Sequence, residues 1–166
     1  SKTVTSLEYQ HSEFVLNGEG YHADVSIKGD KMKHVIDRGS KTFARGESYD
    51  VAYFDLKAGT VEAYCEEIDC EDRNAVINTD TDLFSMITPY DMISEITVGL
   101  SKGSAMYDKR EVVIVEYEVA GSTVRVYIWE FKGIPLKYEV LDDGEILRKI
   151  EYKGLVINGV KEELVH

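Results

Sequence analysis

Apolar and polar residues alternate at period two over much of the chain, and this alternation predicts β-strands. In residues 21–28 every second side chain is apolar, as in a strand with one buried face. A turn at Gly29-Asp30 follows, and residues 32–37 alternate in the same way, so the two stretches predict a hairpin. His34 falls on the apolar side, where a structural histidine is a better interpretation than a ligand.

The second half of the chain has the pattern of an antiparallel meander, in which strands are joined by tight turns. Asp142-Asp143-Gly144 gives the strongest turn signal, because these residues adopt positive φ at low cost. Residues 7–16 fit a helix or a strand equally well. Strands are predicted over residues 49–56, 60–66, 111–119, 123–131, 136–141 and 145–153, and one more is expected over 155–157.

One segment departs from period two and predicts a small helical insert near the middle of the chain. Residues 80–87 place apolar side chains after an acidic cap, which suits a short helix. Thr88 then fits an N-cap, with Pro89 at the first helical position and Asp91 near the positive helix end. The residues therefore predict an α+β fold, and we expect a single domain over residues 1–166.

Charge and composition exclude several classes of partner. The chain has 166 residues, which fits one domain. It carries 19 Lys and Arg against 31 Asp and Glu, a net charge of −12. This charge opposes phosphate binding, so neither nucleic acid nor an anionic membrane surface is an expected partner. No apolar run approaches the roughly 20 residues that span a bilayer, and no transmembrane segment is expected.

The sequence contains no recognisable catalytic or cofactor-binding motif. It lacks a phosphate-binding Gly-rich loop, a zinc-protease motif and a nucleophile elbow. Residues 78–82 begin like a calcium loop, but Leu83 stands where that loop needs Gly and Pro89 where it needs Glu. Helix capping explains these acids better. We therefore predict no catalytic residue, no metal site and no cofactor.

Cys65 and Cys70 are the two cysteines of the chain. They can form a small disulfide loop if their Cα atoms approach within about 6 Å. Two free thiols are the alternative, and metal ligation is disfavoured because no further ligand is placed to complete a tetrahedron. A disulfide would indicate an oxidising compartment or a hyperthermophilic source.

Aromatic residues gather on strands that we expect to be neighbours, and two interpretations stay open. They can form a packed sheet core with cross-strand pairs. Alternatively, they can line an apolar cavity between a curved sheet and the helical segment 82–97, sized for a lipid or acyl chain. The residues concerned are Tyr53, Phe54, Tyr64, Tyr117, Tyr127, Trp129, Phe131 and Tyr138.

The order of these elements resembles the lipoprotein-carrier (LolA/LolB-like) superfamily, including its uncharacterised prokaryotic lipoprotein relatives. The similarity covers roughly residues 20–160. It rests on the strand turn at residues 28–33, the Tyr-rich hairpin that begins at residues 49–55, and a strand ending in Trp129 before Gly133-Ile134-Pro135-Leu136-Lys137.

The resemblance implies an incomplete, curved antiparallel barrel whose concave face is covered by the short helical insert. Members of the family carry hydrophobic ligands or lipid-modified proteins and are not enzymes. We therefore expect a carrier of a hydrophobic small molecule or a lipidated protein, located outside the cytoplasm and compatible with a membrane tether ahead of residue 1. The alternative is a structural or protein-interaction module with a packed core and an acidic binding surface. The candidate ligand-binding residues are Phe84, Met86, Ile87, Ile93, Tyr127 and Trp129.

Overall fold

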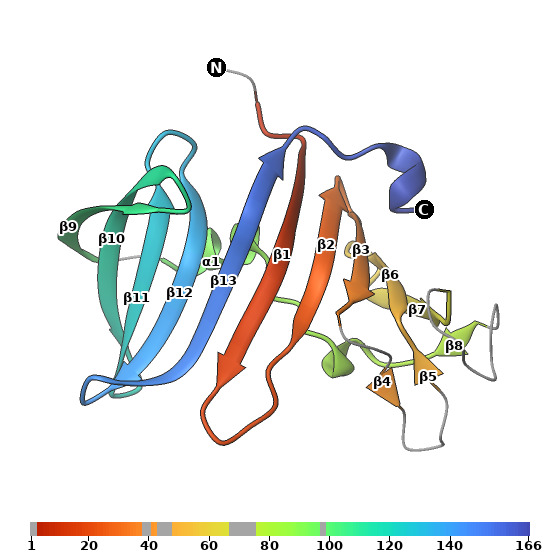
Figure 1. Ribbon diagram of the computed structural model, residues 1–166, viewed down its shortest axis with the longest axis horizontal. Coiled ribbons are helices and arrows are strands. Elements are labelled where there is room, and N and C mark those ends of the chain that lie inside the picture. The colour runs from red at the N-terminus through yellow and green to blue at the C-terminus, as the bar shows by residue number, and fades with distance from the viewer. Residues whose placement is uncertain (1–2, 38–40, 43–47, 67–75, 97–98) are drawn as a thin grey trace. The chain divides into compact units, whose positions relative to one another are not determined.

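The computed structural model describes residues 3–37, 41–42, 48–66, 76–96 and 99–166, and Figure 1 labels its elements. The chain divides into two compact units. Unit 1 contains Ser1–Gln10, His22–Met86 and Leu155–His166, and unit 2 contains His11–Tyr21 and Ile87–Gly154. Strands β1 (Ser6–Val15) and β13 (Glu145–Ile157) contribute residues to both units. The expectation of a single domain stays a prediction.

Unit 1 is built on antiparallel strands that follow β1 in the order β2, β3, β6, β7 and β8. The predicted first hairpin is confirmed, since Ala23 pairs with Ile36 and Ile27 pairs with Met32. A separate two-stranded ladder joins β4 to β5. The bounds are β2 (His22–Lys28), β3 (Lys31–Ile36), β4 (Lys41–Thr42), β5 (Ser48–Tyr49), β6 (Val51–Asp55), β7 (Thr60–Tyr64) and β8 (Ile77–Asn78).

The period-two alternation of β2 and β3 buries one face of unit 1. Val25 and His34 pair across the two strands, and both are buried on that face. The His34 ring lies 4.6 Å from the ring of Phe54, centroid to centroid. The structural interpretation of His34 therefore agrees with its position inside an apolar core.

Tyr49 is buried in the same core, and this burial raises the pKa of its hydroxyl well above the ordinary value of 10.0. The unfolded chain releases this proton above about pH 10, whereas the folded chain keeps it. The stability contributed by neutral Tyr49 is therefore fully present below pH 10 and is lost as the pH rises further. We expect Tyr49→Phe to flatten the fall in unfolding free energy between pH 10 and 12, measured with urea. An unchanged slope would contradict this assignment.

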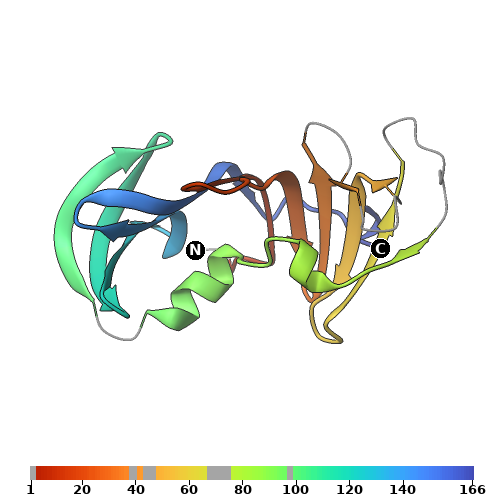
Figure 2. The ribbon, with the colours of Figure 1, turned by 90° about the horizontal axis from the view of Figure 1, so that it is seen from below.

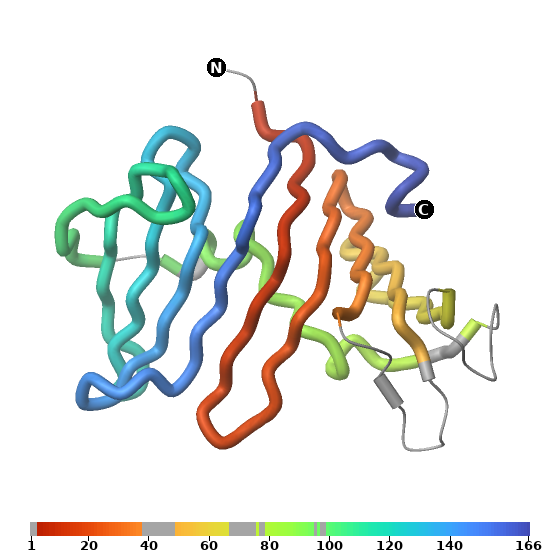
Figure 3. The backbone as a smooth tube through the Cα atoms, viewed as in Figure 1, coloured from red at the N-terminus to blue at the C-terminus, as the bar shows by residue number. Residues whose placement is uncertain are grey.

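Unit 2 is an up-and-down meander in which β13, β12, β11, β10 and β9 are successive neighbours, as the backbone trace shows (Figure 3). All described pairings in it are antiparallel, which confirms the meander predicted from residue 111 onward. The bounds are β9 (Leu100–Tyr107), β10 (Arg110–Val119), β11 (Ser122–Trp129) and β12 (Ile134–Asp142).

Two strand predictions need correction. The separate strand expected over 155–157 is wrong, because β13 continues through Gly154, whose φ of 62° glycine adopts without steric cost. Strand β9 was not predicted, since its Gly- and Ser-rich sequence lacks alternation. It forms by pairing with β10, so tertiary pairing overrides weak local preference here.

The helical insert is shorter than predicted. Helix α1 (Pro89–Glu95) begins as expected: the Thr88 hydroxyl accepts from Asp91 N–H at 3.3 Å, and the Asp91 carboxylate accepts from Thr88 N–H at 2.9 Å. The helix expected over 80–87 is wrong, because only one 3₁₀ turn forms, η1 (Thr81–Leu83). Asp80 caps this turn by accepting from Asp82 N–H at 3.2 Å, which confirms the capping interpretation. A second 3₁₀ turn is η2 (Glu162–Leu164).

The predicted antiparallel sheet is confirmed, with little helix and without closure into a barrel, whereas the cover of a concave face by the helical insert stays a prediction. Among the described residues the strand order begins at β8 and ends at β9, and these two strands do not pair. In the same part of the chain, no helix has the length and apolar character needed to span a membrane.

Candidate functional site

The strand register divides the side chains of unit 2 between two faces. Val126 pairs with Val115 on one side and with Tyr138 on the other. Directly paired residues of antiparallel strands point to the same face, so these three share a face. Tyr127 pairs with Ile114 and Lys137 and lies on the opposite face.

Helix α1 lies against the face of Val126, which we call the helix-side face (Figure 2). Tyr138 pairs with Ile150, and Tyr152 follows on the same side of β13. The Tyr152 hydroxyl donates to the backbone carbonyl of Ile87 at 2.8 Å, directly before the N-cap of α1. The contact between α1 and β12 agrees with this placement.

The helix-side face is apolar but incompletely covered. Val124 and Val126 are buried, as is Met92 of α1. Toward β10 the apolar side chains are only half-buried, and we call this set the apolar strip. It consists of Val113, Val115 and Tyr117 of β10, Ile128 of β11, and Tyr138 and Val140 of β12.

Helix α1 adds apolar side chains that are more exposed than its buried Met92. Ile93 is 46% exposed and Tyr90 is 45% exposed. After the helix, the chain passes close over the strip, because a Cβ added to Gly99 would lie 2.3 Å from Val115 Cγ1. A glycine at this position therefore permits the close approach of the chain to β10.

A buried polar cluster occupies the part of the helix-side face that β1 and β13 form. His11 Nε2 lies 3.0 Å from Glu13 Oε1, and Arg148 donates from Nε to Glu13 Oε2 at 3.0 Å. The His11 ring meets the rings of Tyr21 and Tyr152 edge-on, at 5.6 and 5.7 Å. Through Tyr152, the cluster is linked to the residue that precedes the α1 cap.

The opposite face of unit 2, which we call the outer face, carries paired charges and aromatic rings. Arg110 lies over the Trp129 ring at 4.6 Å, and Lys137 lies over the Tyr127 ring at 4.8 Å. Burial raises the pKa of the Tyr127 hydroxyl above its ordinary value. Arg125 donates to Glu116 at 2.8 Å on the same face. Each of the two rings is therefore paired with a cation of the same face.

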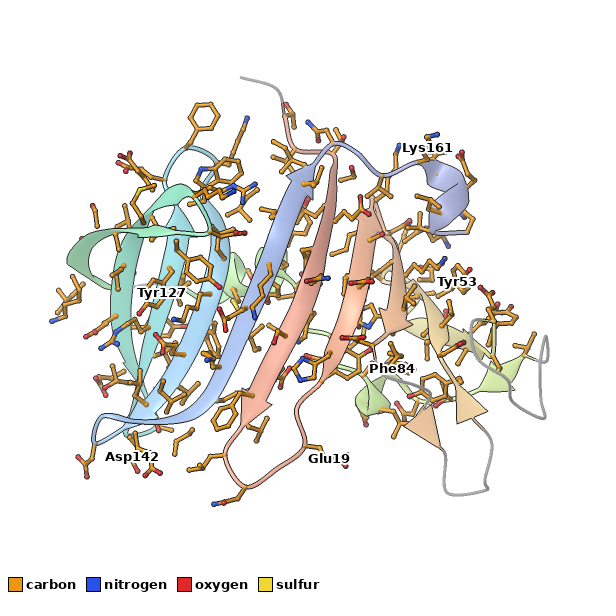
Figure 4. The ribbon with its side chains drawn as sticks, in the orientation of Figure 1. Glu19, Tyr53, Phe84, Tyr127, Asp142 and Lys161 are labelled. Atoms are coloured by element: carbon orange, nitrogen blue, oxygen red, sulfur yellow. The ribbon has the colours of Figure 1, made fainter. Side chains whose placement is uncertain are left out.

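The structure divides the six predicted ligand-binding residues between the two units. Phe84 and Met86 belong to unit 1, and the other four belong to unit 2. Ile93 lies in α1, and Ile87 directly precedes the N-cap of that helix. Tyr127 and Trp129 lie on the outer face, and Tyr127 is labelled in Figure 4. A ligand-binding role for any of the six stays a prediction.

Phe84 is part of a packed aromatic core in unit 1 (Figure 4). Its ring lies 5.0 Å from that of Phe54 and 5.2 Å from that of Tyr49, and the residue is 7% exposed. The packed-core interpretation therefore describes Phe54, and Phe84 packs in the same core. Met86, two residues later, is half-buried.

Sequence reasoning missed the apolar strip, although one signal for it was present. Residues 112–115 are Val-Val-Ile-Val, an apolar run rather than an alternating one. Such a run places apolar side chains on both faces of a strand. It indicates that β10 needs apolar cover on two sides.

Unit 1 contains an open pocket of about 920 Å³, and it is not the apolar cavity expected from the sequence. The Lys31 ammonium donates to Asp55 at 2.7 Å, which raises the pKa of Lys31 and lowers that of Asp55. The hydroxyl of Thr79 is buried there and has no hydrogen-bond partner among the residues that the structure describes. The polar side chains that line the pocket include Lys31, Asp55, Glu62, Asp80 and His166.

The predicted cysteine pair is only half described. Cys65 is buried directly after β7, and Cys70 lies outside the described residues. The disulfide therefore stays a prediction. Among the described side chains, no group of three or more His, Cys, Asp or Glu is placed to hold a metal ion.

No family model matches the chain, and no curated protein matches it. Several solved structures are similar to it in fold. MucB of Pseudomonas aeruginosa, solved in complex with MucA, has a TM-score of 0.62 at 11% identity, covering 98% of this chain and 55% of that chain. An uncharacterised conserved protein from Thermus thermophilus has a TM-score of 0.59 at 11% identity, covering 98% and 84%. A LolA superfamily protein from Nitrosomonas europaea has a TM-score of 0.38 at 9% identity, covering 98% and 90%.

The similarity to MucB establishes the fold. MucB has a LolA-like fold, so the resemblance to the lipoprotein carriers is confirmed at the level of fold. The chain spans about half the length of the MucB chains that it matches, 55% and 57%.

Proposed function

We propose that this chain is a non-enzymatic domain that binds a hydrophobic ligand, a lipid or the acyl chain of a lipidated protein, outside the cytoplasm. The observation that carries the proposal is the apolar strip on the helix-side face of unit 2. The lipoprotein-carrier resemblance supports both the ligand class and the location. In this proposal α1 is the helical cover of the concave face.

The strip has the dimensions and chemistry of an acyl-chain site. Val113 and Tyr117 are four residues apart on β10, which corresponds to about 13 Å along a strand. Covering half-exposed apolar side chains gains about 25 cal/mol for each Å² removed from water. An extended hydrocarbon lying along β10, with Ile93 and Tyr90 at its side, would remove such area from several residues at once.

Helix α1 can form one side of the proposed ligand site, because its N-terminal end is held in place. A helix of seven residues is marginal by itself. Its N-terminus is held by the Thr88–Asp91 capping box and by the hydrogen bond from Tyr152 to Ile87. Met92 of α1 is buried against the unit, whereas Ile93 is exposed and available to a ligand.

The test is a fluorescence titration with 11-dansylaminoundecanoic acid. We expect one molecule to bind per chain, and Ile93→Asp to weaken binding about tenfold or more, because a carboxylate would have to be desolvated by the acyl chain. The matched control is Val156→Asp, which changes a 50% exposed residue in unit 1. Circular dichroism checks that both variants fold. Absence of binding, or equal binding by both variants, would refute the proposal.

A protein-binding role is the second candidate. The observation that favours it is the fold similarity to MucB, which was solved in complex with MucA. The net charge of −12 would then favour a basic partner. Such association weakens with added salt, whereas apolar ligand binding in the strip does not. Salt dependence therefore separates the two candidates.

A further inference from the structure

Strand β9 forms an edge of unit 2 (Figure 1). Within the described residues it pairs with β10 alone. Its second side therefore presents backbone N–H and C=O groups without a strand neighbour in the described part of the chain. Such an edge can accept another strand unless it is protected.

The edge carries few of the protective features that edge strands normally have. Residues 96–107 contain no Asp, Glu or Pro in a chain with 31 acidic residues, and Lys102 is their one charged side chain. Residues 100–106 are all exposed, and Met106 is 66% exposed. Gly103, with a φ of 112°, and a register shift opposite Val113 and Val115 interrupt the strand. The regular part of the free edge is therefore Ser104–Tyr107.

The side chains of β9 indicate what kind of segment would fit. Ser104 pairs with Val113, and Ser101 pairs with Val115, so both serines lie on the helix-side face beside the apolar strip. These small side chains leave room for large apolar side chains from a neighbouring strand. On the outer face, Lys102 lies 3.9 Å from Glu116 and is half exposed, so it can pair with a further carboxylate.

We propose that β9 is the docking edge for an extended segment of a partner protein, apolar at alternating positions and acidic between them, which adds to the sheet as a strand. A second copy of this chain is a poorer occupant. An antiparallel pair of β9 strands would place small residues opposite one another, and Lys102 would meet no carboxylate on the other β9 strand. The proposal does not depend on ligand binding by the apolar strip.

The test uses a fluorescein-labelled peptide with the sequence of residues 110–119, REVVIVEYEV, in which apolar and acidic residues alternate over the positions of residues 115–119. This segment already pairs with β9 inside the fold. Fluorescence anisotropy with the full chain measures its affinity, and amide hydrogen exchange locates it. We expect binding together with slower exchange at residues 104–107. A peptide with proline at the positions of Val113 and Val115 loses two backbone donors and should not bind.

Met106→Glu is the informative variant and Val156→Glu its matched control, since both replace an exposed apolar strand residue. Met106 pairs with Glu111 on the helix-side face, so Met106→Glu should weaken the peptide about tenfold, because its carboxylate would be desolvated against the apolar side chains of the added strand. Val156→Glu should not weaken it. Equal binding to both variants, or no binding of the peptide, would overturn the proposal. Self-association of the chain that Met106→Glu abolishes would also overturn it, because the occupant would then be a second copy.

Discussion

Replacing Phe84 by alanine is expected to lower the free energy of unfolding by about 3–5 kcal/mol, the usual cost of removing a buried aromatic ring from a packed core. The Phe84 ring contacts the rings of Phe54, Tyr49 and His34. Its removal leaves these rings without a packing partner on one side, and the rigid strands below cannot collapse to fill the space.

Urea unfolding at pH 7 measures the Phe84 effect. Leu83→Ala is the control, since the preceding residue is also apolar but is exposed. We expect the control to lose less than about 1 kcal/mol. An equally small loss for Phe84→Ala would show that this ring is not part of a packed core, and would restore the cavity interpretation of Phe84.

Replacing Glu13 by alanine is expected to destabilise the protein by about 2–4 kcal/mol, because it leaves buried polar partners without their carboxylate. Glu13 is 7% exposed and lies between the His11 ring and the Arg148 guanidinium, at 3.0 and 2.9 Å. Arg148 remains partly exposed to water, which places the expected loss below that of a fully buried pair.

A double-mutant cycle with Arg148→Ala tests the Glu13 prediction by chemical unfolding. We expect Glu13→Ala to cost clearly less in the Arg148→Ala background, because the unpaired cation is then absent. Equal costs in the two backgrounds would mean that the two side chains are not energetically coupled.

Local signals predicted the elements that depend on neighbouring residues. The Gly29-Asp30 hairpin and the Thr88 capping box each need only a few residues close in sequence, and both form as expected. Strand β9 could not be predicted in this way, since its pairing with β10 is what orders it. The Glu13–Arg148 contact joins residues 135 positions apart, and no pattern in the sequence indicates it.

The candidate site was predicted only in outline. The helical stripe predicts Ile93, which lies in α1, whereas Ile87 lies just before the Thr88 N-cap because the helix predicted over 80–87 does not form. Tyr127 and Trp129 were chosen because they are aromatic, yet they alternate with the buried Val124 and Val126 and so occupy the outer face. Strand alternation was visible in the sequence, but the side covered by α1 depends on how the chain folds back from residue 87.

Binding of a hydrophobic ligand in the apolar strip of unit 2 can be followed residue by residue in a methyl NMR titration of the Ile-, Leu- and Val-labelled chain with dodecanoate. We expect saturable shifts at Val113, Val115 and Ile93, with Val25 and Val61 of unit 1 unchanged. Shifts confined to unit 1, or no shifts at saturating dodecanoate, would contradict it.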